Sequence, residues 1–235
     1  MLRNPLERRQ ALKAIGGAGL GIAFGCGSES GASPSATGSA AASATGTAST
    51  NSTCAVTPTE TAGPFPSLAD FLRSDIRESR PGTTLNVTIK VVNVNAACAA
   101  VSNANVEIWQ CDAVGNYSSY GSQAGQTYLR GIQVTNANGE VTFTTIYPGW
   151  YQGRATHIHA EVTIGGRSIK VTQIAFPESV NDVVHATGAY ASRGRNPTTN
   201  LRDGIFADSL SAELVTPAGS PTGGYSANFQ IGISI

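Results

Sequence analysis

The feature of this sequence that most restricts its fold is a series of short segments in which apolar and polar residues alternate. In LNVTIKVVNV (85–94) the apolar residues stand at every second position up to Val91. Because successive side chains of a β-strand point to opposite faces, this spacing predicts a strand with one buried face. Further predicted strands are NVEIWQC (105–111), EVTFTTI (140–146), THIHAEVTI (156–164), SIKVTQIAF (168–176) and ANFQIGISI (227–235).

Residues that favour turns separate these segments. Gly165 and Gly166 stand between two predicted strands and indicate a tight hairpin. The one helix candidate of note, LADFLRSDIRE (68–78), is short, and residues 177–226 are rich in Gly and Pro. We therefore expect an all-β fold, with an antiparallel β-sandwich core, long loops and little helix.

The first 53 residues differ in composition from the rest of the chain. Residues 1–26 begin with a basic stretch that contains Arg8 and Arg9, followed by a short apolar run interrupted by Gly. This pattern resembles a twin-arginine export signal, and an ordinary secretory signal is the alternative. Residues 27–53 are small and polar and predict a disordered linker, so residues 54–235 are expected to form one domain.

Cys26 ends the apolar run, directly before the linker. It could carry a lipid and anchor the protein to a membrane, although the residues before it match the lipoprotein pattern imperfectly. We expect export across the inner membrane, by the twin-arginine route. Periplasmic, membrane-anchored and secreted locations all remain open.

The predicted domain contains three cysteines: Cys54, Cys98 and Cys111. Outside the cytoplasm cysteines can oxidise, and three of them allow three different single bridges. We favour a Cys98–Cys111 bridge, because each cysteine flanks a predicted strand and the loop between them is short. Cys54 would then be free or paired elsewhere.

The charge of the chain bears on its partners. It has 15 basic and 15 acidic residues and hence no formal net charge. Nucleic-acid binding rests on Lys and Arg side chains that neutralise phosphates, so this balance argues against a nucleic-acid partner.

Two of the three histidines stand in one predicted strand, as His157 and His159. Residues two apart on a strand share a face, so both imidazoles could bind a single metal ion. Imidazole suits zinc, copper, iron and nickel, and the pair alone does not identify the metal. The alternative is two solvent-facing histidines on a half-exposed strand. His185, in the loop-rich region, is interpreted as a loop histidine rather than a further ligand.

Two tyrosines extend the histidine pair to a set of four potential ligands. Tyr117 follows the predicted strand 105–111, and Tyr151 lies in a turn before the histidine strand. A trivalent cation favours phenolate, and two phenolates with two imidazoles would suit ferric iron. A zinc site would more often recruit cysteine or a third histidine. Taken singly, each tyrosine could equally be an ordinary core or surface aromatic.

Several ordered motifs resemble the intradiol ring-cleavage dioxygenase family, which includes protocatechuate 3,4-dioxygenase and catechol 1,2-dioxygenase. The resemblance covers nearly the whole domain, from about residue 54 to 230. Its motifs are TPTETAGPF (57–65), NVEIWQCDAVGNYSSY (105–120), TYLRGIQVTNANGEVTFTTIYPGWYQGRATHIHAEV (127–162) and TQIAFP (172–177). The chain is most similar to the exported, compact members of this family.

The resemblance implies a role for six residues. The four iron(III) ligands of the family fall on Tyr117, Tyr151, His157 and His159. Tyr151 is the tyrosinate expected to leave the metal and take a proton from the substrate. Arg154 would stabilise negative charge that develops on the substrate, and Gln173 would orient an oxygen species by hydrogen bonding.

The implied reaction is cleavage of a catechol-type ring by O2 between its two hydroxylated carbons, which gives a muconate-type diacid. The implied cofactor is Fe(3+), and the partners are a small aromatic diol and O2. Two other functions remain open on the residues alone. One is an exported β-sandwich binding module with a structural or adventitious metal at the histidine pair, and the other is a zinc hydrolase.

Overall fold

We describe residues 54–235 from a computed structural model of the chain. The expected export signal (1–26), Cys26 and the expected linker (27–53) lie outside the described residues. Within residues 54–235, no helix is long and apolar enough to cross a membrane.

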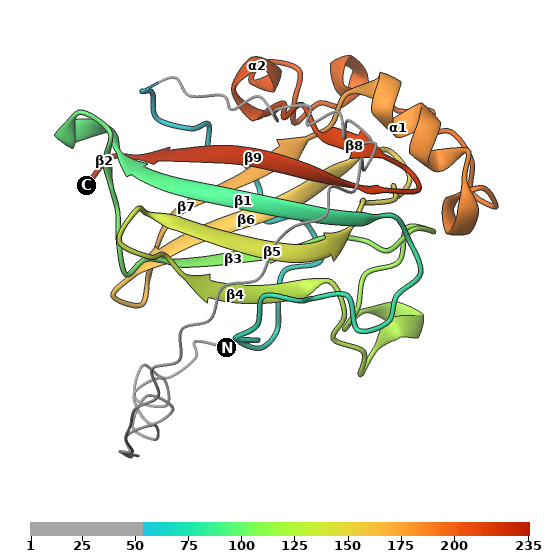
Figure 1. The fold of residues 1–235 in the computed structure, drawn as a ribbon, viewed down its shortest axis with the longest axis horizontal. Helices are drawn as coiled ribbons and strands as arrows, with labels where there is room; N and C mark the ends of the chain where they lie inside the picture. Colours follow the sequence, from blue (N-terminus) through green and yellow to red (C-terminus); the bar gives the residue numbers. More distant parts are fainter. Residues whose placement is uncertain (1–53) are drawn as a thin grey trace, which may run out of the picture. The chain divides into compact units, whose positions relative to one another are not determined.

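The described chain folds into two β-sheets (Figure 1). The first sheet has the order β2-β1-β9-β8, with β5 paired to β1, and the second has the order β4-β3-β6-β7. The strands are β1 (Thr84–Asn93), β2 (Ala99–Ala100), β3 (Asn105–Trp109), β4 (Arg130–Val134), β5 (Glu140–Ile146), β6 (His157–Ile164), β7 (Arg167–Ala175), β8 (Ala218–Ser220) and β9 (Gly224–Ile233). The all-β prediction is therefore confirmed.

The core lies between the two sheets and follows the alternation of the sequence. Leu85 and Val87 of β1 are fully buried in one apolar cluster, together with Ile108 of β3 and Ile158 of β6. The opposite, outer face of the second sheet carries polar and aromatic side chains, including Trp109. That outer face is where the candidate site is found.

The predicted hairpin at Gly165 and Gly166 connects β6 to β7. Both glycines have positive φ values, 58° and 81°, as a two-residue hairpin turn of this kind requires. The turn pairs Ile164 with Arg167, and a bulge at Val162 and Thr163 then shifts the register by one residue, so that His159 stands opposite Gln173.

One pairing departs from the expected antiparallel pattern. β1 pairs with β9 in parallel, whereas the other strand pairings of the two sheets are antiparallel. The register places Asn93 beside Ile233, so the end of β1 lies next to the end of the chain.

The predicted Cys98–Cys111 disulfide is wrong. The structure has a Cys54–Cys98 bridge, and Cys111 is free and buried. The cause is tertiary: the backbone N–H of Thr57 donates to the carbonyl of Gly232 in β9 (3.0 Å), which brings the start of the domain to the end of β1. Cys111 instead packs on the outer face of the second sheet, in a cluster with Trp109.

The predicted helix at 68–78 is also absent. This segment runs in extended form and makes two isolated bridges, Leu72 to Ile132 and Asp75 to Thr144. The fully buried Ile76 belongs to the core cluster. A short helix is marginal on its own, so hydrogen bonds to the sheets and burial of this side chain decide the local structure.

The region 177–226 holds more helix than expected. It contains the α-helices α1 (Glu178–His185) and α2 (Leu210–Glu213) and the 3-10 helices η4 (Gly188–Tyr190) and η5 (Asn200–Arg202). Pro177 precedes α1, where its fixed φ suits a helix start. α2 packs against β7.

Candidate active site

The two histidines of β6 point to the outer face of the second sheet and meet at their ring nitrogens. His157 and His159 are 2% and 1% exposed, and their Nε2 atoms lie 3.1 Å apart. The residue between them, Ile158, faces the core. The expectation that both imidazoles share one face is therefore confirmed, whereas the alternative of solvent-facing histidines is wrong.

Each imidazole is fixed by a neighbour. The Nδ1 atom of His157 lies 2.6 Å from the carbonyl oxygen of Ala155. A carbonyl can only accept, so Nδ1 carries the proton and Nε2 presents its lone pair toward His159. The ring of His159 stacks on Trp109, with centroids 4.9 Å apart and planes 3° from parallel.

Burial keeps both imidazoles neutral. It lowers the pKa of His157 to about 3, with a further contribution from the Arg154 cation. Burial also lowers the pKa of His159 well below the usual value, and His157 adds to this effect. A neutral imidazole is the form that binds a metal, so the pair is ready to act as ligands across the physiological pH range.

Tyr117 reaches the histidines from the loop after β3. Its hydroxyl oxygen lies 3.5 Å from Nε2 of His157, and the side chain is buried. Its ring stacks on Phe65 at a centroid distance of 4.6 Å. The guanidinium of Arg130, itself fully buried, lies 5.9 Å from the ring centroid.

Tyr151 approaches from the turn before β6. Its ring lies 5.7 Å from that of His157 and 5.6 Å from that of Tyr117, between centroids. Unlike Tyr117, it is only partly buried. Its hydroxyl lies 3.5 Å from Nη1 of Arg154.

Burial raises the pKa of both phenols. The effect is strong for Tyr117, and for Tyr151 the neighbouring Arg154 opposes it. Without a bound metal ion both phenols are therefore protonated at neutral pH, even with the Arg154 guanidinium nearby. Ionisation of two phenols in this place requires a strongly positive ion among them.

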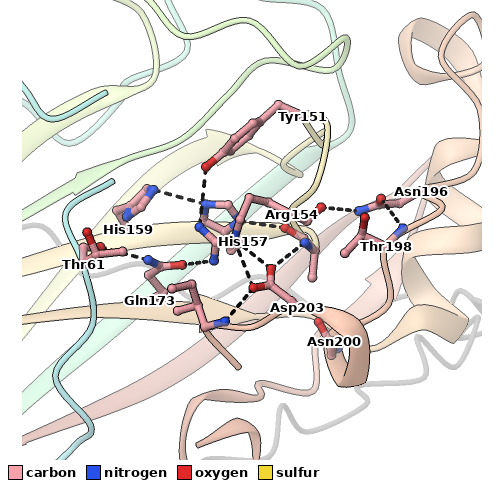
Figure 2. A network of polar contacts seen from close by, with 12 residues as sticks. Thr61, Tyr151, Arg154, His157, His159, Gln173, Asn196, Thr198, Asn200 and Asp203 are labelled. Atoms are coloured by element: carbon pink, nitrogen blue, oxygen red, sulfur yellow. Dashed lines mark hydrogen bonds and ion pairs between the residues drawn. The ribbon is translucent and has the colours of Figure 1, made fainter. Parts of the chain in front are cut away.

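Arg154 and Gln173 form a connected network beside the ring nitrogens (Figure 2). Nη2 of Arg154 donates to Oε1 of Gln173 (2.5 Å), and Nε2 of Gln173 donates to the carbonyl of Thr61 (2.9 Å). Nε of Arg154 donates to Asp203 at 2.8 Å. Asp203 was not predicted as a site residue from the sequence, because it lies in the loop-rich region without a motif around it.

The segment before β1 covers the site. Phe65 packs on both tyrosines, and Gly63 lies so close to His159 that a Cβ would stand 3.1 Å from the ring. Gly63 has a φ of 66°, which favours glycine. The motif TPTETAGPF was noted only as part of the resemblance, and the structure shows its packing role.

His185 does not join the site. It is the last residue of α1, is buried, and contacts the carbonyl of Pro148 through Nε2 at 3.1 Å. The prediction of a loop histidine is therefore wrong in its location, since packing of α1 buries this residue.

A surface pocket of about 550 Å³ opens beside the loops that carry the two tyrosines. Its lining residues are Val114, Trp150, Gln152, Ser192, Arg193 and Pro197. Two of them flank Tyr151 in the chain, and the guanidinium of Arg193 lies 4.1 Å from the Trp150 ring centroid.

The donor set fits a ferric ion better than zinc. Among residues 54–235 there is no group of three His, Cys, Asp or Glu side chains that could hold a metal. The donors that converge are two neutral imidazoles and two phenols, one buried and one partly buried. Hard anionic phenolate oxygens with imidazole suit iron(III), whereas a zinc site would bring cysteine or a third histidine.

Comparisons with known proteins agree with this geometry. A family model described as "Dioxygenase" matches residues 65–195. An intradiol ring-cleavage dioxygenase from Tetranychus urticae is 32% identical, with a TM-score of 0.72 over 77% of this chain and 95% of that one. The chain belongs to the intradiol ring-cleavage dioxygenase family.

Two further relatives place the chain within this oxidoreductase family. The dioxygenase domain of a carbohydrate-binding fusion protein from Streptomyces sp. SirexAA-E is 28% identical, with a TM-score of 0.59, over 77% of this chain and 99% of that one. Catechol 1,2-dioxygenase of Candida albicans is 32% identical over 108 residues. That match spans 37% of this chain and 36% of the relative, so only about a third of the curated relative is covered.

Proposed function

We propose that the protein is a non-haem iron(III) dioxygenase that cleaves catechol-type rings between their two hydroxylated carbons, with O2 as the oxidant and a muconate-type diacid as the product. The observation that supports this most is the meeting of four donors. The Nε2 atoms of His157 and His159 lie 3.1 Å apart, the Tyr117 hydroxyl is 3.5 Å from the first of them, and the Tyr151 ring stands beside both His157 and Tyr117.

The residues that would hold iron(III) are Tyr117, Tyr151, His157 and His159. When bound, the ion would supply Lewis acidity and a template for the two oxygens of the diol. The chain itself provides fixed, neutral imidazoles, and the rings of Phe65 and Trp109 stack on two of the donors, Tyr117 and His159.

The two tyrosines differ in a way that supports different roles for them in proton transfer. Tyr117 is 4% exposed and stacked on Phe65, whereas Tyr151 is partly buried with its hydroxyl near Arg154. We assign Tyr151 as the base: its phenolate oxygen receives a proton from the incoming diol. The adjacent guanidinium offers a donor to the oxygen that remains negatively charged.

Gln173 supports Arg154 in this scheme. Its amide oxygen accepts from Arg154 and its amide nitrogen donates to Thr61, so the amide is held at both ends. We infer that it keeps the guanidinium directed toward Tyr151. The expected hydrogen bond from Gln173 to an oxygen species stays a prediction.

Metal analysis with a visible spectrum tests the proposal. The purified domain should contain one iron per chain and absorb visible light through phenolate-to-iron charge transfer, and the band should shift when catechol is added. His157→Ala should lose the iron. A colourless, folded protein with tightly bound zinc would overturn the proposal.

We further propose that the protein acts outside the cytoplasm, through an export signal at residues 1–26 and with anchoring by a lipid on Cys26 as an alternative. The Cys54–Cys98 disulfide supports an oxidising compartment. Replacing both Arg8 and Arg9 by Lys in the full chain should leave the protein in the cytoplasm. Unchanged export of this variant would reject the twin-arginine route.

A further inference from the structure

Asp203 is a buried carboxylate that connects the loop before α2 to the candidate site. It is 1% exposed and directly follows η5. Its two oxygens accept from Nε of Arg154 at 3.1 and 2.8 Å, and Oδ2 also accepts from the backbone N–H of Ala155 at 2.7 Å. Oδ1 accepts from the backbone N–H of Ile205 at 2.9 Å. The carboxylate thus accepts four hydrogen bonds, and three of them come from residues of the turn before β6.

The contact of Asp203 with Nε of Arg154 sets the direction of the Arg154 guanidinium. Because Asp203 occupies Nε, the remaining nitrogens face the site: Nη1 lies 3.5 Å from the Tyr151 hydroxyl and Nη2 donates to Gln173 (Figure 2). The Arg154 side chain is 13% exposed and that of Asp203 is fully buried. A charged pair in this environment has few alternative geometries, because any rotation leaves a buried charge without its partner.

The contact of Asp203 with the backbone N–H of Ala155 links the carboxylate to the candidate ligand His157 through a single residue. Ala155 donates its N–H to Asp203 and accepts from Nδ1 of His157 with its carbonyl (2.6 Å). Asp203 therefore holds the N–H side of Ala155, and the carbonyl on the other side of the same residue determines the tautomer of this imidazole. Partners of this kind hold metal-binding histidines in one orientation.

The loop that carries Asp203 is itself well anchored. The backbone N–H of Asp203 bonds to the carbonyls of Thr199 (3.0 Å) and Asn200 (3.3 Å). The Asn200 side chain donates to the carbonyl of Phe176 at 2.9 Å, and the Asn196 side chain donates to the carbonyl of Arg154 at 3.0 Å. Besides the groups it contacts, the carboxylate is thus held in position by the hydrogen bonds of its own loop.

We propose that Asp203 is a positioning residue for ring cleavage, acting on Arg154 directly and on His157 through Ala155. The inference rests on the proposed function, because the reaction gives these two residues their roles. Its structural part, one carboxylate that fixes a guanidinium and an imidazole tautomer, can be measured without any metal or substrate.

The test uses Asp203→Asn, which keeps the shape of the side chain and removes its charge. With iron and catechol, kcat should fall on the order of 100-fold, because a small displacement of a catalytic group is enough for such a loss. The KM for catechol should change much less. Asp208→Asn, an exposed aspartate of the same loop, is the matched control and should retain the wild-type kcat.

The second readout is NMR of the histidine ring nitrogens in isotopically labelled, metal-free protein at fixed pH. Wild-type protein should show His157 as a single tautomer with the proton on Nδ1, and Asp203→Asn should show a mixture of tautomers. This measurement separates the proposal about Asp203 from the proposed function. If the wild type does not cleave catechols, the proposed function fails, yet the tautomer still reports on Asp203.

If Asp203→Asn does not fold, Asp203→Glu carries the test, because it keeps the charge but moves the carboxylate. A folded Glu variant with reduced kcat and mixed tautomers supports the inference. Wild-type kcat together with a single His157 tautomer, in either folded variant, would overturn it.

Discussion

At the scale of single residues, the two tyrosines of the site are held in different ways. Tyr117 is buried and stacked on Phe65 at 4.6 Å, whereas Tyr151 is partly buried and faces Arg154. A buried, stacked phenol is suited to be a permanent ligand. A partly exposed phenol is suited to exchange its place with a substrate oxygen and take up a proton.

This difference predicts distinct effects of removing each hydroxyl. Tyr117→Phe should weaken iron binding by roughly tenfold or more, because a fixed ligand is lost. Tyr151→Phe should keep more of its iron but show a shifted visible band and slow turnover. Iron content per chain and the visible spectrum check both. Tyr225→Phe, on β9 between the sheets, is the control, and identical spectra for all three variants would contradict the assignment.

Gly63 illustrates how close the covering segment lies to the site. An alanine Cβ there would stand 3.1 Å from Cε1 of His159, at a φ of 66°. We expect Gly63→Ala to destabilise the fold by about 1–3 kcal/mol and also to reduce iron binding, because the ring must shift. Chemical unfolding and metal analysis measure the two effects.

Gly165→Ala is the matched control for Gly63. It has a similar φ of 58°, but nothing lies within 4 Å of the added Cβ. Gly165→Ala should lower the free energy of unfolding as Gly63→Ala does, but it should leave the iron content unchanged. Equal iron content in both alanine variants would mean that the contact with His159 does not matter.

At the scale of structural elements, the disulfide ties the start of the domain to the end of β1. Cys54 and Cys98 are separated by 44 residues. Closing a loop of this length restricts the unfolded chain and should stabilise the fold by about 4 kcal/mol in the chain-entropy model. Urea unfolding of wild type and Cys98→Ser, each with and without a reducing agent, measures this.

The reducing agent should destabilise wild type and leave Cys98→Ser unaffected. Cys111→Ala, which removes the free cysteine, should still respond to the reducing agent. Insensitivity of the wild-type unfolding curve to reduction would count against a structural role for the bridge.

The α2 helix adds a pH dependence to the stability. Burial raises the pKa of Glu213 to about 7, although Ser209 and Thr172 donate hydrogen bonds to it. Since the folded pKa lies above the unfolded value, this group favours folding below pH 4.5, and that contribution is lost as the pH rises through 7.

Glu213→Gln removes this ionisation and should therefore gain stability relative to wild type as the pH rises from about 5 to about 8, by at most about 3 kcal/mol. Chemical unfolding of both proteins at the two pH values gives the difference. The explanation fails if the difference in the free energy of unfolding between the two proteins is the same at both pH values.

Strands were easier to predict than the segments between them. Alternation identified the residues of β1, β3, β5, β7 and β9, because each has one face in the core, and the β-branched residues of THIHAEVTI identified β6. β4 was not predicted as a strand, since the first three residues of RGIQV are all buried and the segment lacks a clear alternation. The segment 68–78 has a helical composition, but its bridges to Ile132 and Thr144 outweigh that preference.

At the scale of the whole molecule, the sequence predicted the meeting of His157 and His159, because two residues on one strand need no tertiary information. The approach of Tyr117 and Tyr151 was an inference from family resemblance, and the structure brings both to the histidine pair. The contacts of Asp203 could not be predicted. They depend on how the loop after η5 folds back onto the turn before β6, and no local pattern encodes that.

The pairing of the cysteines in the disulfide is likewise not encoded by any local pattern. Its partner choice follows from the parallel pairing of β1 with β9 and from the contact of Thr57 with Gly232. Both are long-range features of the assembled sandwich. Spacing along the chain favoured the nearer cysteine, Cys111, which lies on the other sheet's outer face.

We propose that this site cleaves a catechol ring between its two hydroxylated carbons and incorporates both atoms of O2 into the product. The most direct test is a single-turnover reaction of the iron-loaded protein with catechol under isotopically labelled O2, with mass spectrometry of the product. We expect a muconate-type diacid that carries both labelled oxygen atoms. A product with one labelled atom or none, or a ring opened next to the diol instead of within it, would contradict it.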